Sequence, residues 1–392
     1  MLQSKENEEY LQSQLITYIG NKRALLDFIG EGLEYVQKKL NKSKLNCFDV
    51  FSGSGIVSRY LKQFSSTLTA NDMELYSYII NDCYLKDYTE RQIQELKSIH
   101  KKISKKIQDE VESLQEERNH GKNIKPGFIS ELYSPEDENQ IQKGERCFYT
   151  TYNANYLDVA RAIIEKEVPP EYKNFFIAPL LSEASIHANT AGIFKGFYKN
   201  SKTGAGQFGG NGKNALSRIL GNIKLDFPLR SNFECPVRLF RKDANELVLQ
   251  DELYNFLPNG KFDLVYLDPP YNQHPYGSNY FMLNLIADYK RPDEEFISRV
   301  SGIPKDWNRS VYNKKKKVHQ AFLDLIKNLR THFALISFNS EGFITKEEMI
   351  ELLSECGKVT VLESKYNTFR GSRNLSGRDI HVTEYLFLVE KM

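Results

Sequence analysis

The stretch Asp263-Leu-Val-Tyr-Leu-Asp268-Pro-Pro-Tyr271 is the part of the sequence that best predicts the fold. Its apolar run around Val265 predicts a short buried strand, as in the parallel sheet of an α/β protein. The two prolines end this strand, because neither has a backbone N–H to donate to a neighbouring strand. Ligands of open α/β sheets bind just beyond the carboxyl ends of the strands. We therefore expect Asp268 and Tyr271 to lie at a functional site.

The four residues from Asp268 to Tyr271 suit the activation of an exocyclic amine on a nucleobase. Such an amine is a poor nucleophile because its lone pair is delocalised into the ring. The carboxylate of Asp268 and a proline carbonyl can each accept one N–H, while Pro269 and Pro270 present no competing donor. The ring of Tyr271 can stack on the base, so that the lone pair points at an electrophilic methyl group. The alternative interpretation is a strand that ends in a Pro-Pro turn with a capping Asp.

The composition indicates a globular protein without a membrane span. The chain has 392 residues, enough for a large core and one smaller domain or insertion. A hydrophobic content of 40% and a charged content of 27% are ordinary for this class. There is no apolar run of about 18 residues, and the polar, acidic N-terminus does not fit a signal peptide. The five cysteines are scattered and form no CxxC pair, which predicts reduced thiols, a cytoplasmic protein and no metal site.

A glycine turn at residues 46–55, Asn-Cys-Phe-Asp-Val-Phe-Ser-Gly-Ser-Gly, predicts the first βα unit of a Rossmann-like sheet. Gly53 and Gly55 let the backbone approach a ligand closely. Ser58 stands where the dinucleotide fingerprint has its third glycine. The turn therefore favours a ligand without phosphates, such as S-adenosylmethionine, over a pyrophosphate cofactor.

Acidic residues end two further predicted strands. Asp72 follows Asp49 at close to the spacing of about 20 residues at which an acidic side chain binds a ribose hydroxyl. Asp243 and Ala244 end the strand that precedes the central one, and the Asp243 carboxylate can accept from the adenine amino group of a nucleoside ligand. The alternative role of each aspartate is to cap the helix that follows it.

Residues 87–236 are polar and predict an inserted, mainly helical region. Apolar residues at helical spacing predict one long helix over about 87–120 and further helices over 156–190. Residues 185–241 hold nine Lys and Arg against two acids. Within them, the glycine-rich segment 185–214 mixes lysines, amides and aromatic residues, as a loop that follows phosphates and reads base edges would. The alternative is a surface loop without a partner.

Other basic segments lie near the two ends of the chain. Lys22 and Arg23 stand at the start of an amphipathic helix, where cations oppose the helix dipole and indicate a bound anion; the alternative is a plain solvated loop. The amide-rich and aromatic residues after Tyr271 can cover a flipped base. Segments 309–318 and 365–378 are basic, and each is a candidate contact for a nucleic-acid strand.

The order of these motifs resembles the α-class N6-adenine DNA methyltransferases, the group of the Dam-type enzymes and of many restriction-modification methylases. Residues 17–23 resemble the family's N-terminal cofactor motif, 49–55 its Phe-x-Gly-x-Gly motif and 71–72 its acidic ribose position. A long insertion then precedes Asp-Pro-Pro-Tyr. The resemblance covers about 15–85 and 237–392.

The resemblance implies an α/β fold, a Rossmann-like S-adenosylmethionine-dependent methyltransferase sheet with an inserted, mainly helical target-recognition domain. Residues 1–86 and 237–392 would form the catalytic domain and 87–236 the DNA target-recognition domain. The expected catalytic residues are Asp268, Pro269, Pro270 and Tyr271. The expected contacts of S-adenosylmethionine are Tyr18, Gly20, Lys22, Asp49, Phe51, Ser52, Gly53, Gly55, Asp72, Asp243, Ala244 and Asp268. The expected DNA contacts are Lys195, Lys199, Lys202, Lys213, Asn272, Tyr280, Arg370 and Arg373.

The sequence thus predicts a site-specific enzyme that methylates N6 of an adenine flipped out of double-stranded DNA. Flipping costs about a few kcal/mol, which phosphate contacts would offset. A cognate restriction endonuclease is an expected partner, and no metal is required. Two other interpretations stay open. One is methylation of another amine, namely cytosine N4, RNA adenine or protein glutamine, although enzymes for those substrates more often carry Ser or Asn where Asp268 stands. The other is a DNA-binding module without catalytic activity.

Overall fold

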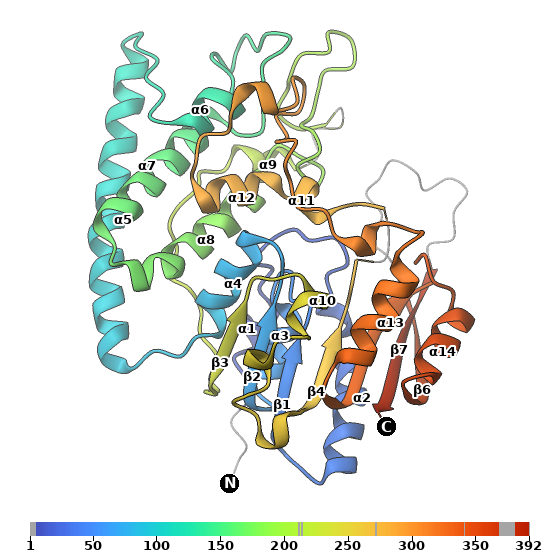
Figure 1. Ribbon diagram of the computed structural model, residues 1–392. Helices are drawn as coiled ribbons and strands as arrows, with labels where there is room; N and C mark the ends of the chain where they lie inside the picture. The colour runs from blue at the N-terminus through green and yellow to red at the C-terminus, as the bar shows by residue number, and fades with distance from the viewer. Residues whose placement is uncertain are drawn as a thin grey trace.

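The computed structural model describes residues 5–210, 212, 215–270, 273–340, 342–367 and 381–391, except for the side chains of 365–367 and 381–382. A seven-stranded sheet fills the lower part of the molecule in Figure 1. The helices α5 to α9, α11 and α12, whose bounds are given below, form the upper part. The strands are β1 (Leu45–Asp49), β2 (Ser65–Asn71), β3 (Val237–Phe240), β4 (Phe262–Leu267), β5 (Thr331–Asn339), β6 (Gly357–Asn367) and β7 (His381–Lys391).

The sheet has the strand order β3-β2-β1-β4-β5-β7-β6. The first five strands in this order are parallel, and β7 runs antiparallel to both β5 and β6. Every residue of β1 and β4 is buried, as their apolar runs predict. The strand order reverses at β1, so the carboxyl ends of β1 and β4 form the crevice where such sheets bind ligands. The predicted Rossmann-like α/β fold is confirmed.

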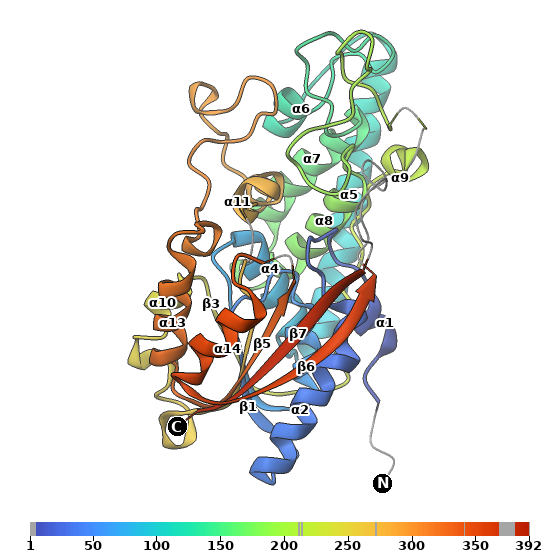
Figure 2. The ribbon, with the colours of Figure 1, turned by 90° about the vertical axis from the view of Figure 1, so that its right-hand side faces the viewer.

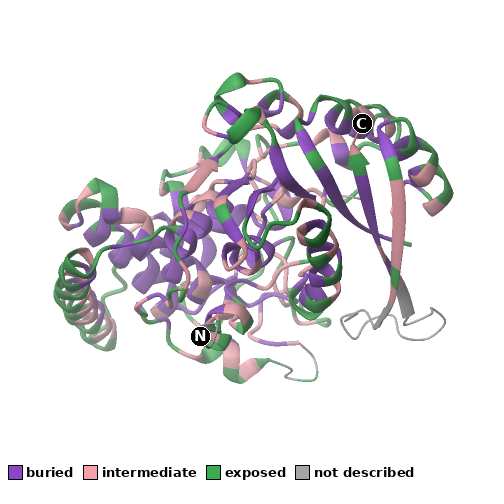
Figure 3. Ribbon diagram, turned by 90° about the horizontal axis from the view of Figure 1, so that it is seen from below, coloured by how far each residue is buried: buried purple, intermediate pink, exposed green. Residues whose placement is uncertain are grey.

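Helices cover both faces of the sheet. One apolar cluster joins α2 (Leu26–Leu40) and α3 (Ile56–Lys62) to one face. A second joins α10 (Ala244–Leu247), α13 (Val318–Asn328) and α14 (Lys346–Ser354) to the other face. Figure 3 shows buried strands between helices whose outer sides are exposed. In Figure 2, β6 and β7 form a long hairpin at the edge of the sheet, between α2 and α14.

The helical part packs around a third apolar cluster, whose members come from both predicted domains. In this cluster α8 of the predicted insertion packs against α4 and α12, which belong to the predicted catalytic domain. The remaining α-helices are α1 (Glu8–Gln12), α4 (Leu75–Leu85), α5 (Glu90–Asn119), α6 (Phe128–Tyr133), α7 (Thr151–Glu167), α8 (Lys173–Ile186), α9 (Leu216–Leu220), α11 (Tyr276–Asn279) and α12 (Phe281–Asp288). The 3-10 helices are η1 (Arg23–Leu25), η2 (Pro170–Tyr172), η3 (Asp251–Leu253), η4 (Pro258–Gly260), η5 (Glu294–Phe296) and η6 (Val311–Asn313). The domain boundaries stay a prediction.

Within the described ranges, no helix combines the length and the apolar composition that crossing a membrane requires.

Candidate active site

A cavity of about 830 Å³, part of it open to solvent, lies at the carboxyl ends of β1, β2 and β4. It therefore occupies the crevice at which the strand order reverses. Of the residues predicted from the sequence to form the site, those that line it are Tyr18, Gly20, Lys22, Asp49, Phe51, Ser52, Gly53, Asp72, Ala244, Asp268 and Pro270. Asn308, Ser310 and Asn313, which the sequence did not single out as site residues, also line it.

The glycine turn after β1 lines this cavity with backbone that carries no large side chain at Gly53. Gly53 has a φ of +51° and Gly55 a φ of +74°, a region that other residues rarely adopt. A Cβ atom at Gly53 would lie 2.8 Å from the ring of Tyr18. The N–H of Gly53 donates to Asp72 at 2.8 Å, and its carbonyl accepts from the hydroxyl of Ser77 at 2.6 Å. Gly55 precedes the first residue of α3 instead of lining the cavity.

Asp49, the last residue of β1, is a buried carboxyl group with one unpaired oxygen. Its Oδ2 accepts from the hydroxyl of Ser58 at 2.6 Å, while its Oδ1 has no hydrogen-bond partner among the described residues. Burial raises the pKa of Asp49 to about 7; the Ser58 hydrogen bond lowers it, and the charge of Asp268 raises it. A cationic ligand in the cavity would relieve the cost of ionising this group.

Asp72 and Glu74 follow β2 and add two more carboxyl groups to the cavity wall. Asp72 accepts from the N–H of Glu74 at 2.9 Å, besides its bond from Gly53. Glu74 accepts from the side-chain amide of Asn284 on α12 at 2.5 Å, and burial raises its pKa to about 7. We did not predict Glu74 as a site residue, although it stands two positions after Asp72. Its contact with Asn284 ties the end of β2 to the helical part.

Asp268 follows the last residue of β4 and forms an ion pair with Lys22. The Lys22 ammonium lies 3.0 Å from Oδ2 of Asp268, and their side chains are 3% and 18% exposed. Oδ1 of Asp268 is buried without a hydrogen-bond partner among the described residues. Burial raises the pKa of Asp268, and the neighbouring ammonium lowers it. One oxygen is thus fixed, and the other can accept from a donor that enters the cavity.

The ring of Tyr18 stacks against two other tyrosines. Its centroid lies 5.0 Å from the ring of Tyr276 and 5.0 Å from that of Tyr280. The hydroxyl of Tyr280 accepts from the N–H of Ile19 at 2.8 Å, and the hydroxyl of Tyr276 donates to the Ile19 carbonyl at 3.1 Å. The segment after the catalytic motif therefore holds the N-terminal loop against the cavity.

A family model described as D12 class N6 adenine-specific DNA methyltransferase matches residues 18–208 and 211–352. The chain belongs to this family. The match runs through the cavity-lining segments and the helical part together. It confirms the resemblance that the order of the motifs indicated.

This D12-class enzyme is also similar to characterised methyltransferases over nearly its whole length. It is 29% identical to the type II methyltransferase M.CviAII of Paramecium bursaria Chlorella virus 1, over 95% of this chain and 98% of the relative. It is 28% identical to the type II methyltransferase M.NlaIII of Neisseria lactamica, over 96% and 99% of the two chains. The modification methylase StsI of Streptococcus sanguinis is 29% identical over 95% of this chain, which covers 52% of that protein.

One predicted contact of the D12-class enzyme is corrected by the structure, and a second stays a prediction. Tyr280 was expected to contact DNA, but it is 0% exposed because α12 packs into the helical cluster, and it supports Tyr18 instead. Asp243 was expected to contact the methyl donor; its Oδ1 accepts from the N–H groups of Asn245 and Glu246 and caps α10, which leaves the ligand contact a prediction for Oδ2. Asp243 does not line the cavity, whereas Ala244 does. The alternative capping role is therefore confirmed for Asp243.

The other expected DNA contacts that the structure describes lie in the glycine-rich segment after α8. Lys195, Lys199 and Lys202 are exposed, and the charge of Lys195 acts with burial to lower the pKa of His274. The N–H of Phe194 donates to the Asn279 carbonyl of α11 at 2.8 Å, which anchors this segment next to the end of the catalytic motif. The predicted residues Lys213, Tyr271, Asn272, Arg370 and Arg373 lie outside the described residues.

The described part of the chain contains no group of three or more His, Cys, Asp or Glu side chains that could hold a metal ion. Its five cysteines are buried and unpaired by disulfides.

Proposed function

We propose that this enzyme transfers the methyl group of S-adenosylmethionine to N6 of an adenine that is flipped out of duplex DNA. The observation that carries the proposal is the state of Asp268. One of its oxygens is held by Lys22, and the other is buried at a ligand cavity, where no described residue donates to it. An acceptor in this state suits the amino group of a base, because that group brings two N–H donors and no charge.

The residues of the cavity fit S-adenosylmethionine. Its sulfonium and ammonium groups are cationic, and the cavity wall carries the four carboxyl groups of Asp49, Asp72, Glu74 and Asp268 against the two ammonium groups of Lys22 and Lys242. When bound, S-adenosylmethionine supplies the electrophilic methyl group. The acidic wall holds and orients it, and the Asp49 Oδ1 without a donor is one candidate acceptor for its ammonium or hydroxyl groups.

Two further residues would orient the methyl donor. Asp72 keeps acceptor capacity, because each of its oxygens takes one backbone N–H and an ionised carboxylate offers about four lone-pair sites. We assign it the ribose hydroxyls. Tyr18 is fixed by its two stacking partners, and its ring forms the part of the cavity wall that lies against Gly53.

The target amine would be held by the residues that follow β4. Oδ1 of Asp268 and the carbonyl of Pro269 each accept one of its N–H groups, which turns the nitrogen lone pair toward the methyl group. We assign Tyr271 to stacking on the base and Pro270 to the cavity wall between base and methyl donor. The nitrogen would bond directly to the methyl carbon as the bond from that carbon to the sulfonium sulfur breaks, which leaves a neutral thioether and no covalent enzyme intermediate. The methylated amine would then lose one proton to solvent. Catalysis would rest on positioning and on fixed charges.

Duplex DNA would lie across the mouth of the cavity. On the side of α11, Lys195 is exposed next to Phe194, whose N–H bonds to α11, and Lys199 and Lys202 are exposed further along the same segment. On another side, the exposed lysines of residues 314–317 directly follow the cavity-lining residues Ser310 and Asn313. Phosphate contacts from both groups would position the DNA and offset the cost of flipping the base, about a few kcal/mol.

The test is to incubate the enzyme with mixed-sequence duplex DNA and tritiated S-adenosylmethionine, and then to identify the labelled base. Label on N6-methyladenine is the expected result, and sequencing the modified sites would give the specificity. Label on cytosine would overturn the choice of base. Label that enters RNA or protein but not duplex DNA would overturn the choice of substrate.

We further propose that the enzyme acts in the cytoplasm with a cognate restriction endonuclease that recognises the same sequence. The support is that the relatives named above are type II methyltransferases and a modification methylase. DNA methylated by this enzyme should resist cleavage by that endonuclease. Cleavage at fully methylated sites would contradict the pairing.

A further inference from the structure

A second buried carboxylate, Glu384 of β7, is not used in the reaction proposed above. It is 5% exposed, and its Oε1 accepts from the side-chain amide of Asn339 at 3.5 Å. Its Oε2 is buried without a hydrogen-bond partner among the described residues. A buried carboxylate with an unpaired oxygen is costly, so its place in the molecule calls for a physical reason.

The sheet brings Glu384 to the catalytic end of the molecule. Glu384 pairs with Asn339, the last residue of β5, in the antiparallel register of β7. On the other side of β5, Ile336 pairs with Leu267 of β4, the residue before Asp268. Glu384 and Asp268 therefore stand at the same edge of the sheet, with one strand between them.

Lys22 and Asp268 are the charged groups that act on Glu384. Burial raises the pKa of Glu384, the Lys22 ammonium lowers it and the Asp268 carboxylate raises it. Glu384 is thus within electrostatic reach of both members of the ion pair. The three side chains thus place two carboxylates and one ammonium at this edge of the sheet, with the ion pair between Lys22 and Asp268; we call them the Lys22 cluster.

The charge of this cluster bears on the proposed reaction. The amine nitrogen becomes positively charged when it gains the methyl group, until it loses a proton. Asp268 and Lys22 alone sum to zero charge, so the pair offers that nitrogen little net attraction. An ionised Glu384 leaves the cluster with one net negative charge. In a buried site, such a fixed charge stabilises a developing cation far more than it would in water.

We propose that Glu384 is a positioning residue for methyl transfer, which serves as the second counter-ion of Lys22 and keeps the Lys22 cluster negatively charged. Glu384 touches neither base nor methyl donor in this scheme; it acts through Lys22. This inference rests on the proposed adenine methyltransferase activity.

The first experiment measures single-turnover methylation and binding in the Glu384→Gln variant. We expect the rate to fall roughly tenfold, less than the loss of about 10²–10³-fold seen when a group on the reacting atoms is removed. The dissociation constants of S-adenosylmethionine and duplex DNA should stay within about twofold of the wild-type values. The matched control is Glu390→Gln, an exposed glutamate on the same strand, which should leave the rate unchanged. An unchanged rate in Glu384→Gln would overturn the proposal.

The second experiment tests whether Glu384 acts through Lys22, by a double-mutant cycle with Lys22→Met. With Lys22 present, Glu384→Gln should lower the thermal unfolding midpoint, because the ammonium loses a counter-ion. In the Lys22→Met background it should leave the midpoint unchanged or raise it, because Glu384 then only repels Asp268. Equal shifts in both backgrounds would show a merely structural role and overturn the proposal. The midpoint can be measured even where turnover is lost.

These results are separable from a failure of the proposed function. If wild-type enzyme labels no adenine, the proposed function fails before any variant is made. If wild-type enzyme labels adenine and Glu384→Gln does so equally fast, only the role of Glu384 is lost.

Discussion

Asp158 in the helical part and Asp268 at the cavity are both carboxylates whose pKa is raised by burial. They differ in their donors. Asp158 of α7 accepts from the N–H groups of Ile129 and Ser130 at 3.2 and 2.8 Å and from the hydroxyl of Tyr289 at 2.8 Å. Oδ1 of Asp268 has no partner among the described residues. The cost of burial is thus offset within the protein at Asp158, whereas at Asp268 a donor must come from a ligand.

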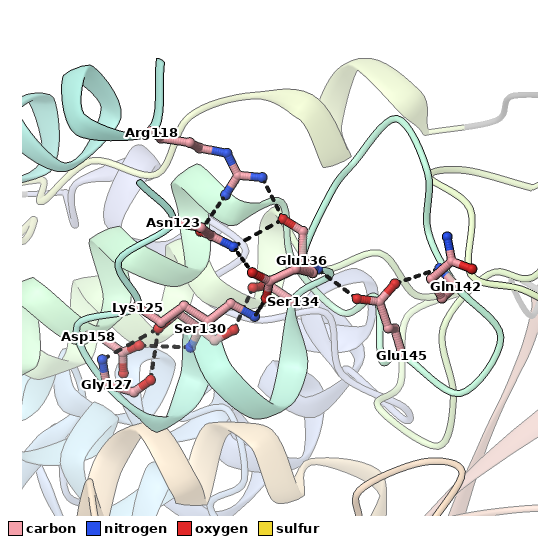
Figure 4. A network of polar contacts seen from close by, with 10 residues as sticks. All are labelled: Arg118, Asn123, Lys125, Gly127, Ser130, Ser134, Glu136, Gln142, Glu145 and Asp158. Atoms are coloured by element: carbon pink, nitrogen blue, oxygen red, sulfur yellow. Dashed lines mark hydrogen bonds and ion pairs between the residues drawn. The ribbon is translucent and has the colours of Figure 1, made fainter. Parts of the chain in front are cut away.

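Around Asp158, carboxylates nearer the surface also have donors within the protein. In Figure 4, Asp158 reaches the start of α6, and the loop before this helix is fixed by Glu136. Glu136 accepts from the amide of Asn123 and pairs with Lys125 at 2.9 Å, while the guanidinium of Arg118 donates to its carbonyl at 2.8 Å. Each carboxylate drawn there, namely those of Glu136, Glu145 and Asp158, accepts from donors of the protein. Buried carboxylates are therefore informative about function only once their donors are known.

The largest expected effect is on turnover in Asp268→Ala. Removing the acceptor should lower the methylation rate by at least about 10³-fold, because the amine loses its orienting group. Lys22 would be left as a buried cation without this partner, so the double variant Asp268→Ala/Lys22→Met serves as the control for folding. Both variants should lack turnover, and the double variant should unfold at a temperature near that of the wild type. A normal rate in either variant would contradict the mechanism.

The next expected effect is on stability, in Asp158→Asn. An amide can accept only on its oxygen, so one of the N–H groups at the start of α6 would lose its acceptor. We expect the free energy of unfolding to fall by about 1–3 kcal/mol. At a temperature where the variant is folded, its turnover should stay near that of the wild type. Asp109→Asn on the exposed side of α5 is the matched control and should change neither quantity. Loss of turnover in a fully folded Asp158→Asn enzyme would contradict the view that Asp158 serves only stability whereas Asp268 serves turnover.

The predicted strands and the glycine turn could be found from the sequence because their signals are local. The apolar runs of β1 and β4 and the glycines after β1 act over a few residues. By contrast, β6 is an edge strand whose residues 358–364 are only partly buried or exposed, so it lacks the apolar run that identifies a buried strand.

The features of the site that the sequence did not reveal depend on contacts between distant parts of the chain. Tyr280 is buried because α12 packs against α4 and α8, which the sequence around it does not reveal. Asp243 has the same local pattern as a ligand-binding aspartate and as an N-cap, and the observed hydrogen bonds show the capping role for its Oδ1. Glu384 gains its place at the catalytic edge of the sheet through the register of β5 and β7. The predicted roles of Lys195, Lys199 and Lys202 stay predictions.

A smaller effect is expected from pH, which should change stability and ligand affinity in opposite directions. Asp49 and Glu74 have pKa values raised to about 7, against ordinary values of 3.8 and 4.5. Their protonated forms favour the folded state, so the ligand-free enzyme should lose stability as pH rises from about 4 to 7. Affinity for the cationic methyl donor should instead rise through pH 7, by up to about tenfold for each group that must ionise.

Two measurements check this expectation. Thermal unfolding of the ligand-free enzyme at pH 6 and 8 gives the change in stability, and calorimetric titration with S-adenosylmethionine at the same pH values gives the affinity. Asp49→Asn should flatten both dependences. If affinity fell as pH rose, the acidic wall would not be the part of the cavity that binds the cation.

The smallest expected effect concerns exposed charges, which have no burial cost to offset. The lysines of residues 314–317 are exposed beside the cavity and form no ion pair with a described carboxylate. Changing Lys315, Lys316 and Lys317 to Gln should weaken duplex binding a few-fold near 0.15 M salt. It should also reduce the slope of log K against log salt by up to about 0.9 for each phosphate that the variant no longer neutralises.

The matched control changes the same number of exposed lysines on α5, far from the cavity: Lys97, Lys101 and Lys105. Both triple variants lower the net charge equally, so a difference between them isolates the position of the charges. Turnover at saturating DNA should be unchanged in both, because the altered side chains hold the duplex and not the amine. If the two variants bound duplex DNA equally weakly, the lysines beside the cavity would add only to a general attraction. If only the first variant showed weaker binding and a smaller slope, DNA would have to pass the edge of the cavity formed by Ser310 and Asn313, the same cavity that Asp268 lines.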